Sequence, residues 1–313
     1  MNKRITVLLA GLVLGISSLP SMAAAKKPLD LANADDAFRV MVRFACSETE
    51  GRHTLYWWQG KVYSRVEGEP DRLLFKLQGM NMRQCRMYKD PVRGLGYRSV
   101  SREVMLYLDP VTNEVARRWK NPWTGKELEV LHVANDPVNL SVRDTGAPRI
   151  LWSRNEKGEP LPWSDSYLLK DGVILEGGNA ARLFYKNPLA GDYQEQVGGW
   201  YHAMEFGTQA ARASEALDPD DPQIDDAMLS WGRISKWLPW MEMGDRQGIL
   251  IFHTAGLRLD SWEQIPEVMR DELEKNYAKY REPPPLDDAR PNETSWTVFQ
   301  KYLESRKAPA PGP

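Results

Sequence analysis

The chain has 313 residues, a formal net charge of −2 at pH 7 and 42% hydrophobic residues. A length of this order fits one large all-β or α/β domain, and the near balance of charge argues against binding to nucleic acid or to an anionic membrane surface. Twelve Trp and twelve Tyr supply much of the surface that a core can bury.

The first 25 residues have the pattern of an export signal. Lys3 and Arg4 precede an apolar run from Ile5 to Leu14, and small residues up to Ala25 fit a cleavage site. The apolar run is shorter than the roughly 17 to 25 residues that a spanning helix needs. We expect an exported, periplasmic protein with no integral membrane segment after cleavage, and the alternative is an uncleaved anchor.

Cys46 and Cys85 are the two cysteines of the chain. In an oxidising compartment they would form a disulfide whose closed loop, about 40 residues long, stabilises the fold by roughly 4 kcal/mol. Two separate buried thiols are the alternative. Neither cysteine belongs to a C-x-x-C motif or has a His close in sequence, so the cysteines do not predict a metal site.

Short runs with a period of two extend from Phe38 to about Phe252 and are broken by turn residues. In the first run, Val40, Val42 and Phe44 alternate with Arg and Met, and "RLLFKLQGM" and "REVMLYLD" continue the rhythm. The stretches "DPVTNE" and "NPWTGKE" favour chain reversals. Helical crossovers between the early strands are absent from the pattern, so we predict an antiparallel sheet.

The stretch "RHTLYWWQGKVYSRV" places three large rings side by side. On a strand, Tyr56 and Trp58 share one face and Trp57 lies on the other, so both faces need cover. We therefore expect a mainly β (α+β) fold in which a large antiparallel meander is barrel-like and is closed by C-terminal helices. A two-layer sandwich with a helix over one sheet is the alternative.

After Phe252 the period becomes helical. "SWEQIPEVMRDELEKNYAKYRE" predicts an amphipathic helix capped by Ser261, and "SWTVFQKYLESRK" predicts a second, shorter helix. We predict a signal peptide over 1–25, one β-rich domain over 26–282 ending in the amphipathic helix, and a Pro-rich linker, short helix and disordered tail over 283–313.

The stretch "LHVANDPVN" is the best candidate for catalysis. His132 and Asp136 would act as a proton-transfer pair if their side chains met, as in a hydrolase, lyase or isomerase without an organic cofactor. A local turn built on Asn135 and Asp136 is the plainer interpretation. The motifs G-x-S-x-G, G-x-G-x-x-G and H-E-x-x-H are absent, so no cofactor is identified and no metal site is predicted.

The aromatic content favours a ligand cavity instead. We expect the protein to bind a small, largely apolar or aromatic molecule, with Arg83 orienting its polar end. The other predicted wall residues are Tyr56, Trp58, Tyr63, Trp119, Asn135, His202 and Trp240. An interaction module of the cell envelope, with an exposed apolar patch and no cavity, is a further alternative.

Three stretches carry a family resemblance: "YWWQGKVYSRVEGEPDRLLFKLQGMNMRQC", "YRSVSREVMLYLDPVTNEVARRWKNPWTGKELEVLHVANDPVN" and "WLPWMEMGDRQG". They resemble a bacterial family known as domain of unknown function 1838. The likeness covers about Asp35 to Pro283. Cys46 lies outside the quoted stretches, and the helix after Pro283 lies outside the likeness. The resemblance implies membership and brings no reaction or cofactor.

Overall fold

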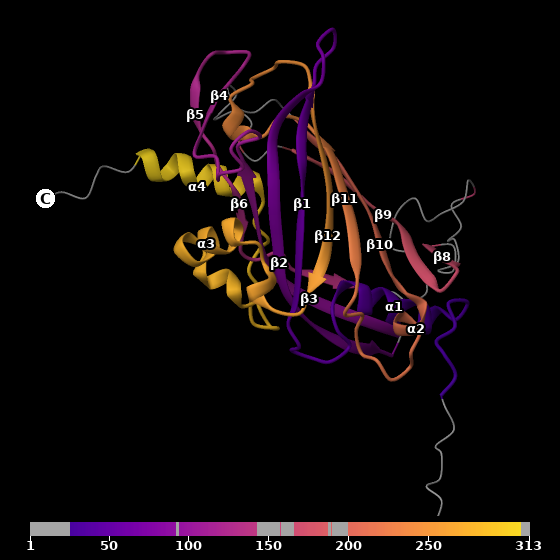
Figure 1. The fold of residues 1–313 in the computed structure, drawn as a ribbon. Coiled ribbons are helices and arrows are strands. Elements are labelled where there is room, and N and C mark those ends of the chain that lie inside the picture. The colour runs from indigo at the N-terminus through magenta and orange to yellow at the C-terminus, as the bar shows by residue number, and fades with distance from the viewer. Residues whose placement is uncertain are drawn as a thin grey trace, which may run out of the picture.

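One large antiparallel sheet dominates the computed structural model, which describes residues 26–91, 94–142, 157, 166–186, 189 and 200–307 (Figure 1). Its strands are β1 (Thr54–Arg65), β2 (Arg72–Asp90), β3 (Gly94–Leu108), β6 (Val133–Asn135), β7 (Leu140–Val142), β8 (Tyr167–Lys170), β9 (Val173–Lys186), β10 (Trp200–Arg212), β11 (Met228–Ser235) and β12 (Ile249–Leu259). They follow the order β6-β3-β2-β1-β12-β11-β10-β9-β8, and β7 also pairs with β3. A separate hairpin consists of β4 (Arg118–Lys120) and β5 (Glu127–Glu129).

The sheet is curved but it is not a barrel. One end of the strand order is β6 and the other is β8, and no strand pairing joins these ends in the described parts of the chain. The predicted antiparallel, mainly β fold is confirmed, whereas the closed barrel is wrong. The end strands are only three and four residues long, so each offers few backbone groups with which a ladder could close the sheet.

The two faces of the sheet bury different clusters. We call the face that carries Tyr56, Trp58 and Val62 of β1 the inner face, and the opposite one, with Leu55 and Trp57, the outer face. The predicted alternation of the three rings is therefore confirmed. Trp57 packs against the cluster under the C-terminal helices, so each face of the aromatic stretch has its own cover.

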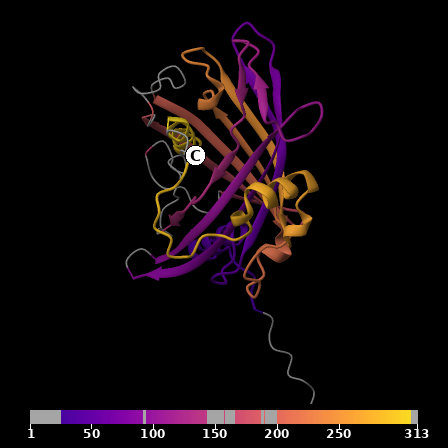
Figure 2. The ribbon, with the colours of Figure 1, turned by 90° about the vertical axis from the view of Figure 1, so that its left-hand side faces the viewer.

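The C-terminal helices cover both sides of the sheet. On the outer face lie η3 (Trp262–Gln264), α3 (Glu267–Asn276) and η4 (Ala278–Arg281), whereas α4 (Ser295–Lys307) lies within the curve and adds Trp296 and Phe299 to the inner cluster (Figure 2). The predicted single helix from Ser261 is interrupted at Pro266, because the residue before a proline avoids the helical region. None of the helices in the described residues is long and apolar enough to cross a membrane.

The first predicted strand is a helix. Asn33 caps the N-terminus of α1 (Ala34–Ala45), because its side chain accepts from the backbone N–H groups of Asp35 and Asp36. Its apolar residues form two pairs, and the members of each pair are four residues apart. Phe38 and Val42 pack in one buried cluster, and Val40 and Phe44 pack in another. Because α1 is buried on two sides, its sequence imitates the alternation of a strand.

Shorter elements connect these parts. A short helix, α2 (Ala213–Ala216), follows β10, and η2 (Pro239–Met241) lies between β11 and β12. A disulfide joins Cys46, at the end of α1, to Cys85 of β2, with their Cα atoms 6.2 Å apart. The disulfide that was one of two alternatives is therefore formed, and it fastens α1 to the sheet.

Candidate functional site

The middle of the inner face is short of side chains. In register, Trp58 of β1 pairs with glycine on both sides, and Trp231 of β11 pairs with glycine on β10. A Cβ atom at Gly79 would lie 2.2 Å from Cε2 of Trp58, so the indole lies flat across that glycine. We call this region the glycine floor, and its glycines are Gly60, Gly79, Gly207 and Gly256.

An arginine and a glutamate form an ion pair beside the glycine floor. Arg233 of β11 donates to Oε1 of Glu205 at 3.2 Å and to the hydroxyl of Tyr201. The side chain of Arg233 is 16% exposed and that of Glu205 is 29% exposed, so both are partly buried. This position gives the floor a charged pair whose formal charges cancel.

The facing side of the curve carries a second carboxyl group. Glu103 of β3 accepts a hydrogen bond of 2.6 Å from Nδ2 of Asn135. Burial raises the pKa of Glu103, the bond from Asn135 lowers it, and the negative charge of Glu205 raises it again. Three strands separate β3 from β11 in the sheet, yet Tyr107 of β3 belongs to the same buried cluster as Tyr201 of β10, which lies beyond β11, because the sheet curves (Figure 2).

Polar atoms around the floor lack partners. Within the described residues no hydrogen bond satisfies Nε1 of Trp58, the hydroxyl of Tyr107, Oδ1 of Asn135 or Nε of Arg233, although each atom is buried. A buried polar atom without a partner costs roughly 1–3 kcal/mol. Five further atoms of this kind lie elsewhere in the described residues, among them Nε1 of Trp57 and Oε1 of Gln78 on the outer face, so they are not confined to the floor.

Tyr56 and Arg83 connect the sheet to α1. The Tyr56 hydroxyl donates to the carbonyl of Phe44, and Arg83 donates to the carbonyl of Ala45 at 3.2 Å and lies 5.6 Å above the Tyr56 ring. Both side chains therefore hold a helix in place, and of the two Arg83 alone keeps partial exposure. Their position borders the glycine floor on the side of α1.

Several predicted wall residues lie away from the floor. Trp119 and Trp240 pack against each other at 5.9 Å between ring centroids, inside a cluster of further rings. Tyr63 follows Val62 on β1 and so lies on the outer face, and His202 is exposed on the outer face of β10. The structure brings Trp58 and Asn135 to the floor and separates them from these four residues.

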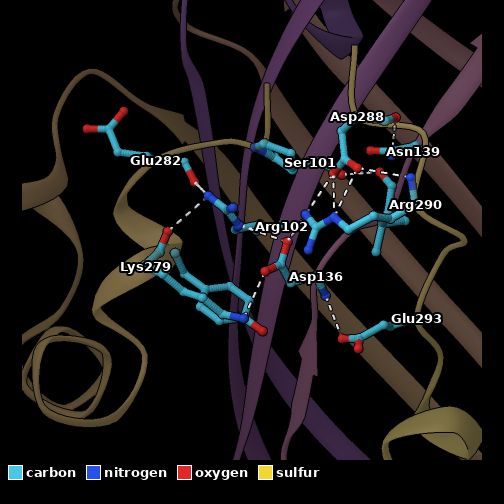
Figure 3. Close-up of polar contacts among 12 residues, drawn as sticks. Ser101, Arg102, Asp136, Asn139, Lys279, Glu282, Asp288, Arg290 and Glu293 are labelled. Carbon is cyan, nitrogen blue, oxygen red and sulfur yellow. Dashed lines mark hydrogen bonds and ion pairs between the residues drawn. The ribbon is translucent and has the colours of Figure 1, made fainter. Parts of the chain in front are cut away.

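His132 and Asp136 do not meet. Nδ1 of His132 accepts from the backbone N–H of Tyr107 at 3.1 Å, and Nε2 has no partner among the described residues. Asp136 instead accepts from Arg102, Lys279 and Arg290 (Figure 3). The predicted proton-transfer pair is therefore not formed, because three cations surround the carboxylate.

The pKa values of the two groups support this conclusion. Burial by itself raises the pKa of Asp136, but hydrogen bonds from Lys279, Arg290 and Arg102 lower it to about 2. Burial lowers the pKa of His132 to about 4, and the positive charge of Arg117 acts in the same direction. At neutral pH the carboxylate is a fixed anion and the imidazole is neutral. Asp136 thus fastens the segment between η4 and α4 to the sheet.

His132 also lines a pocket of about 540 Å³ at the edge of the sheet, between the β4–β5 hairpin, α3 and α4. Arg117 at its wall is bound to Glu272 of α3, and Glu129 accepts from the hydroxyl of Tyr302 at 2.9 Å. Arg117 and Glu129, two charged residues that line the pocket, therefore already have partners within the protein. The pocket is lined by Arg117, Arg118, Glu129, Val130, Leu131, His132, Ala134, Tyr277, Val298 and Tyr302.

The comparison with known families decides the family. The model of a family described as "Protein of unknown function (DUF1838)" matches residues 51–303. This chain belongs to that family. The predicted resemblance is confirmed, but both of its bounds are corrected, because the family match begins at residue 51 instead of Asp35 and continues past Pro283 into α4. Cys46 stays outside the family match.

Other comparisons add little. No curated protein matches the chain. Among solved structures, the crystal structure of a LolA superfamily protein from Nitrosomonas europaea is similar over 75% of this chain and 95% of that chain, with 5% sequence identity and a TM-score of 0.18. A likeness of this size carries no argument about the family's function, so the function must be argued from the site.

Sequence patterns missed the charged pair of the floor. Arg233 lies in the stretch "SWGRISKW" between two tryptophans, and no motif in that stretch predicts an ion pair. Strand alternation across Trp231 and Arg233 is the signal that places both on one face. Glu205 lies on another strand, and its pairing with Arg233 follows from the register of β10 and β11 alone.

Proposed function

We propose that this member of the family is exported to the periplasm and binds a small, largely apolar or aromatic molecule on the glycine floor. The indole of Trp58 lies across Gly79, the nearby Trp231 is half-buried, and four glycines add no side chain to this face, so the aromatic rings form much of its surface. The observation that carries the proposal is the register that pairs Trp58 with glycine on both sides and Trp231 with glycine on β10, which leaves these rings without large side chains opposite them.

Export rests on the N-terminal pattern of Lys3, Arg4 and the short apolar run. The disulfide between Cys46 and Cys85 agrees with an oxidising compartment. No catalytic role is proposed, because the residues predicted for proton transfer do not contact each other.

The test is binding of N-phenyl-1-naphthylamine, a neutral aromatic probe whose emission rises in apolar surroundings. The protein is isolated from the periplasm, and its mass identifies the processed N-terminus. Gly207→Leu adds a large side chain to the floor; its Cβ would lie 3.2 Å from the Ser230 carbonyl oxygen, so the two strands must give by a few tenths of an ångström. We expect probe affinity to fall at least about tenfold, a loss of roughly 1.4 kcal/mol.

Thr208→Leu is the matched control, because the next residue of β10 faces the exposed outer side. It adds the same side chain to the same strand and should leave probe affinity unchanged. Equal affinity in wild type and Gly207→Leu would contradict the proposal, as would a wild-type protein that binds no probe.

One observation favours a second candidate, an interaction module of the cell envelope. Apolar side chains are exposed on the outer face of β10 and β11, where Met204 (41% exposed) pairs in register with Ile234 (38%) and Phe206 (43%) follows on β10. Exposed apolar rows mark contact surfaces. The binding test separates the candidates, because Gly207→Leu leaves this outer row unchanged.

A further inference from the structure

Two parallel rows of side chains cross the outer face of the sheet. Both rows run in register over β2, β1, β12, β11 and β10. The first, which we call the apolar row, consists of Leu73, Tyr63, Ile251, Ile234 and Met204. The second, which we call the basic row, lies roughly 7 Å further along the strands. It begins with Lys76, Lys61 and His253 and continues through Gly232 to Phe206.

The apolar row is open to solvent. Because it spans five neighbouring strands, it is roughly 20 Å long. Leu73 and Ile234 are each 38% exposed, and Met204 is 41% exposed. Phe206 is 43% exposed, although its ring lies so close to Gly232 that a Cβ there would be 2.5 Å from it. A line of exposed apolar neighbours marks a contact surface.

The basic row places like charges side by side. Lys61 lies directly opposite Lys76 on β2 and opposite His253 on β12. Like charges in these positions destabilise a sheet. Lys76 donates to the neutral side chain of Asn113, and within the described residues neither lysine forms an ion pair. The row therefore favours an anionic partner from outside the chain.

Acidic residues are missing from this surface. Glu205 is the one acidic residue of β1, β10, β11, β12 and residues 72–80 of β2, and it lies on the inner face with Arg233. The chain as a whole contains 43 Asp and Glu. Its near balance of charge thus conceals a face on which these strands carry basic side chains and no acidic one.

The shape and charge of this face favour a lipid surface over a protein. A second copy of the chain would bring the same two rows and no carboxylate for the lysines. The outer face is the convex side of the curved sheet, since α4 lies within the curve, so another protein would have to be hollowed to follow it (Figure 2). An anionic membrane yields to apolar side chains and offers phosphates to lysines.

We propose that the apolar and basic rows dock the protein on the surface of a membrane that contains anionic phospholipid. Lys61 and Lys76 meet the phosphates, and the exposed side chains of the apolar row, with Phe206, enter the headgroup region. The proposal does not depend on the glycine floor, which lies on the opposite face of the sheet.

The test is co-sedimentation of the protein, isolated from the periplasm, with vesicles of phosphatidylcholine alone or of phosphatidylcholine mixed with phosphatidylglycerol. We expect binding to the mixed vesicles at low salt. Binding should be at least about fivefold weaker to phosphatidylcholine alone, and also at about 1 M NaCl, where the screening length is about 3 Å.

Lys61→Gln is the decisive variant. It should weaken binding to the mixed vesicles about fivefold, since one lysine near an anionic surface contributes about 1 kcal/mol. It should not lower the free energy of unfolding, because it relieves repulsion from Lys76. Lys120→Gln is the matched control, because it removes the same charge from an exposed position on the separate β4–β5 hairpin. It should leave vesicle binding unchanged.

Ile234→Thr tests the apolar row. We expect it to weaken binding to the mixed vesicles at least about threefold and to leave the salt dependence intact, because no charge is removed. Val111→Thr, at a position that is 84% exposed in a loop, is its control and should bind as wild type does.

Three outcomes would overturn the inference: equal binding of wild type to both kinds of vesicle, no binding to either, or equal binding by Lys61→Gln and Lys120→Gln. A dimer that Ile234→Thr dissociates, with no vesicle binding, would assign the face to a second copy instead. Binding of N-phenyl-1-naphthylamine, measured without vesicles, reports on the proposed function separately and should be the same in Lys61→Gln and wild type.

Discussion

His132 is held as a neutral hydrogen-bond acceptor. Its Nδ1 accepts the backbone N–H of Tyr107, and its ring stacks on the Tyr107 ring at 6.0 Å. The acceptor role places the proton of the neutral ring on Nε2. Protonation of Nδ1 would break the bond to Tyr107, so the folded protein resists it. Burial first, and then the positive charge of Arg117, lower the pKa of His132 to about 4, and neither cause requires a catalytic role.

That low pKa predicts a loss of stability in mild acid. The unfolded chain, with an ordinary His pKa near 6.5, binds the proton before the folded chain does, so stability falls as pH drops from about 6.5 to 4. The loss is at most about 3 kcal/mol. His132→Asn offers a similar acceptor that does not titrate, and it should flatten the curve of unfolding free energy in urea between pH 7 and 4.5.

Asp136 does not interfere in that range, because its pKa of about 2 confines its own effect to lower pH. Wild type and His132→Asn should differ most at the acid end of the range. Parallel curves for the two proteins would show that His132 is not kept neutral by the fold.

At the scale of elements, α4 belongs to the core of the sheet. Trp296 is 4% exposed, and its ring meets that of Tyr201 of β10 edge to face, with 5.2 Å between centroids. Phe299, one turn later, is buried in the same cluster. The helix thus contacts strands that precede it by about a hundred residues, although the sequence pattern divided the chain at residue 282. That division remains a prediction.

Trp296→Ala tests the division. Removing a buried indole should lower the free energy of unfolding by about 3–5 kcal/mol if α4 unfolds together with the sheet. Glu304→Ala, at an exposed position of the same helix, should change stability by less than about 0.5 kcal/mol. Denaturant unfolding monitored by Trp emission gives both values. A Trp296→Ala protein whose main transition is unshifted would support the predicted boundary at 282.

For the whole molecule, the disulfide and the buried arginines hold α1 against the inner face. Arg258 of β12 donates to the carbonyls of Arg43, Cys46 and Ile224, so it ties the end of α1 and the loop before β11 to the sheet. Cys46 and Cys85 add a covalent link at the same place, across 39 residues of sequence. The N-terminal helix is therefore an integral part of the fold.

Replacing both cysteines by Ser should lower the free energy of unfolding by about 2–4 kcal/mol, because the unfolded chain gains the freedom of the opened loop. Reductant should destabilise wild type by a similar amount and leave the double variant unaffected. A variant as stable as oxidised wild type would show that the link adds nothing. Thiols that label readily in the folded periplasmic protein would contradict its formation there.

The sequence by itself determined the elements whose pattern is local. Alternation around Trp57 predicted which rings share a face, and turn residues predicted the reversal at Asp109, whose side chain accepts from Val111 and Thr112. Local patterns succeed there because the neighbours in sequence are the partners in space. The same reasoning predicted a strand where α1 lies. Because α1 is buried on two sides, its apolar residues do not form the single stripe that identifies an amphipathic helix.

Only the tertiary structure decided the site. His132 and Asp136 are four residues apart, yet their partners are a backbone group of β3 and cations from β3, η4 and the segment before α4. Arg233 and Glu205 are 28 residues apart and meet through strand register. The curvature of the sheet brings β3 to face β11, and curvature arises from packing over the whole molecule, which no single stretch of sequence encodes.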